Sequence, residues 1–331
     1  MPFNNKFILL LLLFNAIIIN SVFAENSTSN FETWLSSYKK LALKKGISQE
    51  TINVAFKNVE YLEQVIKYDR KQPEFFEDTE TYVKKRANES RANIAKKLLT
   101  KNKILFDNIE KSFFVEKEIL LSLWGIETNF GKHVGKMDII SSLATLSFDK
   151  RRSEFFSSQL LILLELIDNK LVDPNRLYGS WAGAYGNFQF MPSTIKQYAI
   201  DYDGNNKIEL KSSLDDSFAS AANYIKKIGW KKGEPCFIRV KLNNAIKNKY
   251  INSSARKISP RLKIDKWIKK GVVNYDGTDF KTNLKAALIM PDGKPDTPAF
   301  LVFSNYEKIL KWNRSLRFGI SVCTLANMIK I

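Results

Sequence analysis

Residues 123–132 read LWGIETNFGK and place one glutamate, Glu127, at the end of an apolar, helix-like run, just before a glycine-containing turn. On a helix over residues 115–127, spacings of three and four put this glutamate on one stripe with four apolar residues. The stripe consists of Ile119, Leu120, Leu123, Trp124 and Glu127. Desolvation on such a face raises the pKa of a carboxyl group and keeps it partly protonated near neutral pH, as a general acid requires.

Two structural interpretations of Glu127 stay open at this point. The residue could be a solvated glutamate at a frayed helix end. It could also be a buried glutamate that pairs with an arginine such as Arg151 or Arg152. The stretch alone does not decide between these and a catalytic role.

The composition is that of a globular protein with an excess of positive charge. The chain has 331 residues, enough for one large domain or two smaller ones, and 44% of them are hydrophobic. The net charge of +18 reflects either a general bias toward Lys, Asn and Ile or attraction to a polyanion or acidic surface. The charges are spread along the chain, and we expect no nucleic-acid partner.

The N-terminus has the pattern of a cleaved secretory signal. Lys6 precedes the apolar run FILLLLLFNAIII, and Val22 and Ala24 occupy the −3 and −1 positions of a cut after Ala24. The run is too short to span a bilayer comfortably, and the next residue, Glu25, is not a cysteine that could carry a lipid anchor. We therefore expect residues 1–24 to be removed with their one charge, leaving +17, and the protein to be periplasmic without a membrane span.

Cysteine and histidine are scarce. Cys236 and Cys323, the only cysteines, could pair in an oxidising compartment or be buried singly, and we expect them to be unpaired. His133 is the only histidine, which excludes a zinc site built from several histidines. It lies in a polar, glycine-flanked turn, so we expect an exposed structural residue.

Apolar periodicity predicts a mainly α protein of the α+β class. Residues 31–115 read as helices joined by short turns, and residues 154–168 form another amphipathic helix. The segment CFIRVKL reads as a strand, and ALIMPDGKPDTPAFLVF reads as a hairpin around a Pro/Asp/Gly turn. Helical segments return near the C-terminus.

Residues 179–192, GSWAGAYGNFQFMP, combine three glycines with four aromatics. Glycine permits close backbone approach, and aromatic rings offer flat faces. A tight buried loop is one interpretation. Because Ser180, Asn187 and Gln189 lie among the aromatics, we favour a binding wall suited to sugars, which have apolar ring faces and many hydroxyls.

Several separated motifs, taken in order, resemble the lytic murein transglycosylase B family. They are YDRKQPEFFEDTETYV, LWGIETNFGKHVGK, LATLSFDKRRSEFF, GSWAGAYGNFQFMPST and LKWNRS. The resemblance runs from about Phe31 to the C-terminus and implies one catalytic region over residues 25–331. Its implied parts are a helical N-terminal part (31–115), a lysozyme-like helical core (116–235), a strand-containing insertion (236–304) and C-terminal helices that complete the cleft (305–331).

The resemblance also assigns site residues. Glu127 matches the family's single catalytic glutamate. The positions that match cleft-lining or substrate-contacting residues are Ser180, Gln189, Phe190, Tyr224, Arg151, Arg152 and Asn313. Some relatives have tyrosine where this chain has Trp312 and Phe318, and Phe318 lacks the hydroxyl for any hydrogen bond from that position.

The implied activity is peptidoglycan cleavage by a lytic transglycosylase that needs no cofactor. Glu127 would protonate the oxygen between N-acetylmuramic acid and N-acetylglucosamine, while the muramic 2-acetamido group stabilises the cation. Glu127 would then take the proton of the C6 hydroxyl, which closes a 1,6-anhydro ring. Ser180 and Asn313 would orient the acetamido group. The implied partners are peptidoglycan glycan strands and, beyond them, cell-wall synthesis proteins.

Residues 201–216, DYDGNNKIELKSSLDD, resemble the start of an EF-hand calcium loop. Asp201, Asp203 and Asn205 fall at positions 1, 3 and 5, and Lys207 could offer its carbonyl at position 7. The spacing is therefore right for the first ligands of a hard cation.

The rest of this loop departs from the EF-hand pattern. Asn206 stands at position 6 in place of glycine, and Ser212 stands at position 12 in place of glutamate, which also fits a plain polar turn. Some members of the resembled family bind calcium here and close the site with a later acid, which implies Asp216, or Asp215 if the loop is one residue shorter. We expect a structural calcium site.

Two other functions compete with the transglycosylase. A hydrolytic muramidase would need a second acid opposite Glu127, and the resemblance assigns none. A non-catalytic peptidoglycan-binding or scaffolding protein would have no need for a desolvated acid. The products released from cell-wall sacculi discriminate among the three.

The N-terminal pattern makes a direct prediction. The exported protein should begin at Glu25, because cleavage follows the small residue Ala24. N-terminal sequencing of the exported protein checks this, and a chain that exists only with Met1 intact would contradict it.

Overall fold

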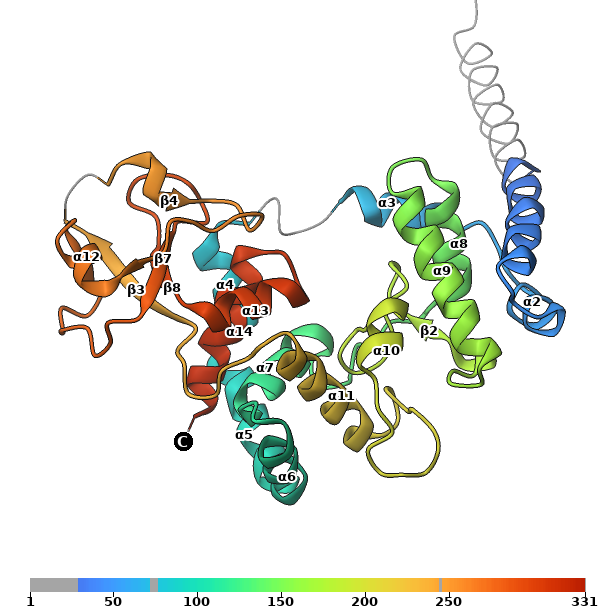
Figure 1. Ribbon diagram of the computed structural model, residues 1–331, viewed down its shortest axis with the longest axis horizontal. Helices are drawn as coiled ribbons and strands as arrows, with labels where there is room; N and C mark the ends of the chain where they lie inside the picture. Colours follow the sequence, from blue (N-terminus) through green and yellow to red (C-terminus); the bar gives the residue numbers. More distant parts are fainter. Residues whose placement is uncertain (1–28, 72–76, 244–245, 331) are drawn as a thin grey trace, which may run out of the picture. The chain divides into compact units, whose positions relative to one another are not determined.

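The computed structural model describes residues 29–71, 77–243 and 246–330, and the chain forms two compact units (Figure 1). The first unit contains residues up to Arg70, Lys136–Ala184 and Met191–Ser193. The second contains Lys71–Gly135, Tyr185–Phe190 and Thr194–Ile331. The units are therefore built from interleaved segments, whereas the predicted parts follow one another along the chain. The predicted leader, residues 1–24, lies outside the described residues.

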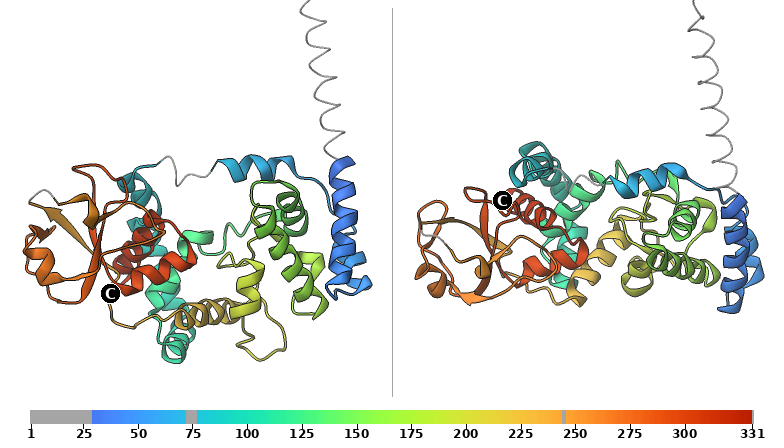
Figure 2. Two further views of the ribbon diagram at one scale, coloured as in Figure 1. Left: turned by 45° about the horizontal axis from the view of Figure 1, so that its top comes forward. Right: turned by 90° about the horizontal axis from the view of Figure 1, so that it is seen from above.

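The first unit is mainly helical. A helix over residues 29–44 is followed by α2 (Gln49–Ala55), α3 (Glu63–Arg70), α8 (Ile139–Phe148), α9 (Ser153–Asp168) and the 3-10 turn η2 (Pro174–Arg176). Helices α8 and α9 lie side by side (Figures 1 and 2). The short strand β1 (Met137–Asp138) directly precedes α8 and pairs antiparallel with β2 (Tyr178–Gly179), which follows η2. The Asp138 carboxylate caps α8 by accepting from the Ser141 N–H.

The second unit joins a helical part to a sheet. Its helices are α4 (Thr79–Arg86), α5 (Glu89–Lys101), α6 (Lys103–Phe113), α7 (Lys117–Thr128), α11 (Leu214–Lys227), α13 (Ser304–Trp312) and α14 (Leu316–Ile329). Helix α10 (Pro192–Tyr198) crosses the boundary between the units along the chain. Helix α14 packs against α7, α4 and α5, so the C-terminal helix contributes to the core around the predicted catalytic helix.

The sheet has six strands in the order β4-β7-β8-β3-β6, with β5 also paired to β7. The strands are β3 (Phe237–Leu242), β4 (Ile251–Asn252), β5 (Leu262–Lys263), β6 (Val272–Asn274), β7 (Lys285–Ile289) and β8 (Ala299–Val302). Strands β7 and β8 form the antiparallel hairpin predicted from the sequence, and CFIRVKL supplies β3, as expected. The sheet packs around the fully buried Trp267 of the short helix α12 (Ile264–Ile268), whose ring N–H donates to Ala286 O.

The prediction of unpaired cysteines is wrong. Cys236 and Cys323 form a disulfide with a Cα–Cα distance of 6.2 Å. Cys236 directly precedes β3, and Cys323 is buried on α14. The sequence separation of 87 residues concealed a contact that arises only when the sheet packs beside α14.

Helix α7 is buried more completely than an amphipathic helix. Eight of its twelve residues are buried, including Trp124, whose ring meets Phe130 and Phe218 edge to face. The predicted single stripe is therefore a helix enclosed on nearly all sides, and Glu127 stands on its last turn. Among the described residues, no helix is long and apolar enough to cross a membrane.

Candidate active site

The backbone reverses directly after Glu127. Helix α7 ends at Thr128, and Asn129, Phe130 and Gly131 then take positive φ angles of 50°, 59° and 80°. Gly131 is required, because a Cβ there would lie 2.9 Å from Asn187 Oδ1 and because L residues disfavour this φ. This reversal ends the helix one residue after the glutamate.

The Glu127 side chain is held by a tryptophan from the end of α13. Trp312 Nε1 donates a hydrogen bond of 2.9 Å to Glu127 Oε1. Glu127 is half-buried, so it is neither the fully solvated residue of one interpretation nor the fully desolvated residue of the other. Because an indole N–H can only donate, Trp312 fixes Oε1 as an acceptor.

Aromatic rings surround Trp312. Its indole stacks on Tyr224, with ring centroids 5.1 Å apart, and Tyr224 stacks on Tyr198 at 4.3 Å. Phe190 and Phe188 meet Trp312 edge to face. The stack holds the indole in one orientation, so the direction of its N–H depends on packing.

Tyr224 and Phe190, both predicted to contact substrate, belong to this aromatic cluster. Burial, followed by the neighbouring Tyr198, raises the pKa of Tyr224 to about 12, so its hydroxyl stays neutral. That hydroxyl donates to the Lys311 carbonyl at 3.0 Å. In this structure Tyr224 therefore supports α13 and the Trp312 indole.

The loop after Ala184 is closed by its own hydrogen bonds. Tyr185 and Phe190 exchange two backbone bonds of 2.9 Å, and Gln189 takes a positive φ of 51° between them. The Gln189 amide nitrogen donates to the carbonyls of Val134 and Gly186. Gln189 thus fixes the shape of the loop that presents Phe190, while a direct contact with substrate stays a prediction.

Asn187 is a buried, hydrogen-bonded residue and does not line an open binding surface. It is 4% exposed, and its Oδ1 accepts from Trp124 Nε1 at 3.0 Å. Its carbonyl accepts from Thr128 Oγ1, and its amide nitrogen donates to Lys211 O and Ser217 Oγ. The buried-loop interpretation is therefore correct for Asn187.

Asn313 and Phe318 follow Trp312 in the chain. Asn313 is half-buried just after α13, and its carbonyl accepts from the Ser315 N–H at 2.8 Å. It adjoins Trp312, so it belongs to the same part of the second unit as Glu127. Phe318 is 3% exposed on α14, where it packs as an ordinary core residue.

The remaining predicted site residues lie in the first unit. Ser180 Oγ accepts from the backbone N–H groups of Ala182 and Ala184, which stabilises a tight turn. Arg151 and Arg152 both bind Asp69, within the same unit. A part in substrate binding stays a prediction for these three residues.

Asp69 is the unpredicted member of this ion triad. Burial alone would raise the pKa of Asp69, but hydrogen bonds from Arg151 and Arg152, together with their charges, hold it below its ordinary value. Arg151 Nε lies 2.6 Å from Asp69 Oδ2, and a second Arg151 nitrogen donates to the Asp69 carbonyl at 2.7 Å. Asp69 therefore determines where both guanidinium groups lie.

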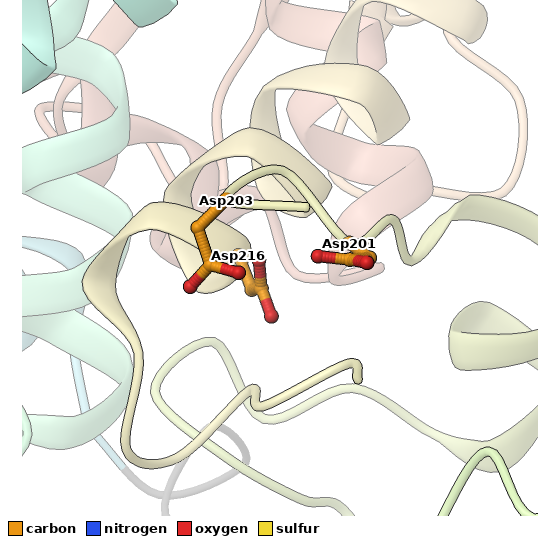
Figure 3. Close-up of side chains that lie close together, drawn as sticks. All are labelled: Asp201, Asp203 and Asp216. Atoms are coloured by element: carbon orange, nitrogen blue, oxygen red, sulfur yellow. The ribbon is translucent and has the colours of Figure 1, made fainter. Parts of the chain in front are cut away.

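The predicted calcium loop gathers three carboxylates. Asp201, Asp203 and Asp216 offer oxygens that lie within 4.8 Å of one another, and they come together as Figure 3 shows. Asp216, not Asp215, closes the cluster. Partial desolvation, followed by the nearby charges of Asp216 and Asp201, raises the pKa of the exposed Asp203.

The loop around the three carboxylates is preorganised by backbone bonds. Three successive N–H groups, those of Gly204, Asn205 and Asn206, point at the Asp201 carboxylate. Asp216 is fully buried and accepts from the N–H groups of Tyr202 and Glu209.

Sequence reasoning missed Glu209, although it stands at position 9 of the EF-hand pattern. Its carboxylate accepts from Asn205 Nδ2 and Ser212 Oγ. Although Asn206 and Ser212 differ from the EF-hand pattern, the loop still presents several carboxylate oxygens, which are the ligands that a hard cation prefers.

Comparison with known proteins identifies the class. The Transglycosylase SLT domain matches residues 30–327. SltB3 from Pseudomonas aeruginosa, solved in complex with NAG-NAM-pentapeptide, superimposes with a TM-score of 0.83 and 33% identity, over 90% of this chain and 79% of that one. The fold is that of the lysozyme-like lytic transglycosylases. The chain belongs to the Transglycosylase SLT domain family.

Two Escherichia coli proteins are also similar. Slt35, a lytic transglycosylase solved in complex with calcium, has a TM-score of 0.75 and 25% identity, over 91% of this chain and 93% of that one. The membrane-bound lytic murein transglycosylase B of strain K12 is 42% identical over 142 residues, which are 41% of this chain and 39% of that protein. The latter match thus spans about two fifths of the relative's length.

The Asp69 triad predicts a pH-dependent contribution to stability. Because the pKa of Asp69 is lowered in the folded state, its stabilisation should be complete well above the unfolded value of about 3.9 and should disappear as pH falls through the lower folded value. Asp69→Asn should lower the free energy of unfolding by about 2 kcal/mol at neutral pH, and by progressively less below about pH 4.

Urea unfolding at several pH values measures this difference. Glu63→Gln is the matched control, because its ion pair with Lys67 is exposed and should contribute less than about 0.5 kcal/mol. An Asp69→Asn deficit that stays constant down to pH 2 would contradict the assignment.

Proposed function

We propose that this protein is a peptidoglycan lytic transglycosylase in which Glu127 is the only catalytic carboxyl group. The main support is the position of the Glu127 carboxylate, which lies at the end of a largely buried helix and accepts a hydrogen bond from Trp312 inside an aromatic cluster. The family match over residues 30–327 supports the same activity. A structure of SltB3 from Pseudomonas aeruginosa in complex with NAG-anhNAM-pentapeptide supports an anhydro product.

In this proposal the two Glu127 oxygens have separate tasks. Since Trp312 donates to Oε1, the exchangeable proton belongs on Oε2. Glu127 Oε2–H gives that proton to the glycosidic oxygen, the bond from the muramic C1 to this oxygen breaks, and the 2-acetamido oxygen stabilises the positive C1. The Glu127 carboxylate then takes the proton of the C6 hydroxyl, and O6 bonds to C1.

This sequence of steps returns Glu127 to its starting state. One proton leaves the acid and one comes back, and no water is consumed, so the products together weigh as much as the substrate. The aromatic cluster around Trp312 offers flat faces for sugar rings, and Asn313 beside it would orient the acetamido group. The triad of Asp69, Arg151 and Arg152 would place cations for the substrate's carboxylates.

We infer a periplasmic location from the N-terminal pattern of residues 1–24 and from the location of the substrate, the cell wall. Cell-wall synthesis proteins remain proposed partners. We also infer that Asp201, Asp203, Asn205 and Asp216 hold a structural calcium ion, which the complex of Slt35 with calcium supports. The ion would neutralise the repulsion among the carboxylates and has no part in the chemistry.

Glu127→Gln tests the catalytic assignment. The amide keeps the shape and can accept from Trp312 Nε1, but it cannot exchange a proton, so activity on purified sacculi should fall by at least about 100- to 10,000-fold. Mass analysis of wild-type products should show 1,6-anhydro ends, lighter by one water than hydrolysis products. Binding to sacculi should persist.

Trp312→Phe is the companion variant, since it keeps an aromatic ring in the stack, although a smaller one, and removes the donor to Oε1. Activity should fall by about tenfold to a hundredfold, the value of one hydrogen bond to a charged group. Wild-type products with only reducing ends would favour the muramidase. A fully active Glu127→Gln would remove Glu127 from the mechanism.

Calcium should raise the melting temperature without changing the products. The gain should follow mass action as the free calcium concentration rises, and it should vanish in Asp201→Ala. Asp215→Ala is the control: it removes an equal charge next to the site but no member of the cluster, so its calcium response should match the wild type. Scanning calorimetry with no calcium-dependent shift at millimolar calcium would leave a polar turn.

A further inference from the structure

Lysines and arginines occur along the whole chain, but half of its net positive charge lies in the sheet part of the second unit. Residues 236–304 carry fourteen lysines and arginines against five aspartates and no glutamate. Their net charge of +9 is half of the chain's +18, in about a fifth of its length. A general bias toward lysine would distribute the charge in proportion to length, so this segment needs a separate explanation.

Two of these lysines lie directly opposite each other. Strand β5 pairs antiparallel with β7 in a register that sets Lys263 against Lys285, and both are exposed. Side chains in such positions stand about 5 Å apart at Cβ, and like charges there are destabilising. An anion bound over both lysines would remove this repulsion.

Helix α12 adds to the same surface. Trp267 anchors it by donating to Ala286 O of β7 at 2.9 Å, and Asn283 Oδ1 accepts from the Asp265 N–H at its first turn. With Ile264 and Trp267 buried, Lys266, Ile268 and Lys269 are left exposed. Ile268 is 50% exposed, an apolar side chain among cations.

We call this surface the basic face. It consists of Lys263, Lys266, Lys269, Lys281 and Lys285, with the exposed apolar residues Ile268 and Leu284. Figure 1 shows α12 on the side of the sheet away from α13 and α14.

The cations of this segment fall into two groups. Arg239 and Arg261 pair with Glu80 and Glu307, which lie outside the segment. Within the described part of the chain, no ion pair involves any of the five lysines of the basic face. The charge of Lys281 helps to lower the pKa of Asp276, and Asp265 is an exposed acid on α12, so the basic face keeps an excess of positive charge for an external partner.

We propose that the basic face docks the protein on an anionic phospholipid surface. Exposed lysines on short connected elements suit a diffuse layer of headgroup charge rather than one enclosed anion, which would be held by buried arginines or converging N–H groups. Ile268 and Leu284 supply the apolar side chains that enter the boundary between headgroups and acyl chains. Binding is reversible, because a few lysines and two apolar side chains make a weak anchor.

Vesicle co-sedimentation tests the proposal with the exported form of the protein, using the same N-terminus in every variant. Phosphatidylethanolamine vesicles that contain phosphatidylglycerol should bind the wild type, vesicles without it should not, and added salt should release the protein. The triple variant Lys263→Gln, Lys266→Gln, Lys269→Gln should bind about a hundredfold less tightly, at about fivefold for each lysine near an anionic surface.

The matched control removes the same charge elsewhere in the second unit. Lys97→Gln, Lys101→Gln, Lys111→Gln changes three exposed lysines of α5 and α6 and should bind almost as the wild type. Ile268→Ser should weaken binding about fivefold and leave its salt dependence unchanged. Thermal melting establishes that the variants are folded. The assay involves no glycan cleavage, so its result is independent of the proposed activity.

Three results would overturn the proposal. Equal loss in the control triple variant would mean that only net charge matters. Binding that does not depend on phosphatidylglycerol would show that the lysine charges do not drive it. Binding of soluble polyphosphate in preference to vesicles would assign the basic face to a soluble polyanion.

Discussion

The buried amide of Asn187 connects the three parts of the candidate site in the second unit. Its side chain accepts from Trp124 of α7 and donates to Lys211 O and Ser217 Oγ beside the carboxylate loop. Its backbone N–H donates to Leu210 O. Every polar atom of this residue thus has a partner, as a buried amide requires. Because breaking one such bond leaves a buried polar group unsatisfied, the helix, the loop and the carboxylate cluster are fixed together.

The close approach around Asn187 also explains two glycines. Gly131 lies against its Oδ1, and a Cβ at Gly186 would lie 2.4 Å from Leu210 O. Both have positive φ angles, so glycine serves the backbone conformation and the contact at once. The result is a chain reversal directly after Glu127 and a loop that carries Phe190 to the Trp312 indole.

The sequence predicts what depends on neighbours along the chain. The helix that carries Glu127, the β7–β8 hairpin and the spacing of Asp201, Asp203 and Asn205 are all local patterns, and the structure confirms the helix and the hairpin. The exposed His133 is confirmed as well. The family resemblance, now shown, supplied the lysozyme-like fold that no single pattern contained.

Contacts across long separations could not be predicted in the same way. The disulfide between Cys236 and Cys323, the Asp69 triad and the bond from Trp312 to Glu127 join residues 82 or more positions apart. Asn187 shows a different limit. An amide among aromatics and glycines looks the same in the sequence whether its side chain contacts a sugar or is packed in the interior. Only its burial in the folded structure distinguishes these two roles.

The connection through Asn187 limits what a cation in the carboxylate loop could do. Leu210 and Lys211 lie between Glu209 and Asp216 in the chain, and their carbonyls accept from Asn187, which in turn holds Trp124 and Thr128 of α7. A cation would neutralise the cluster and keep these carbonyls in place, and it would thereby stiffen the C-terminal end of α7. Glu127 itself receives its donor from Trp312, on α13, which that chain of bonds does not include. A cation there would therefore stabilise the frame of the candidate site, while the orientation of the Glu127 carboxylate depends on the aromatic stack.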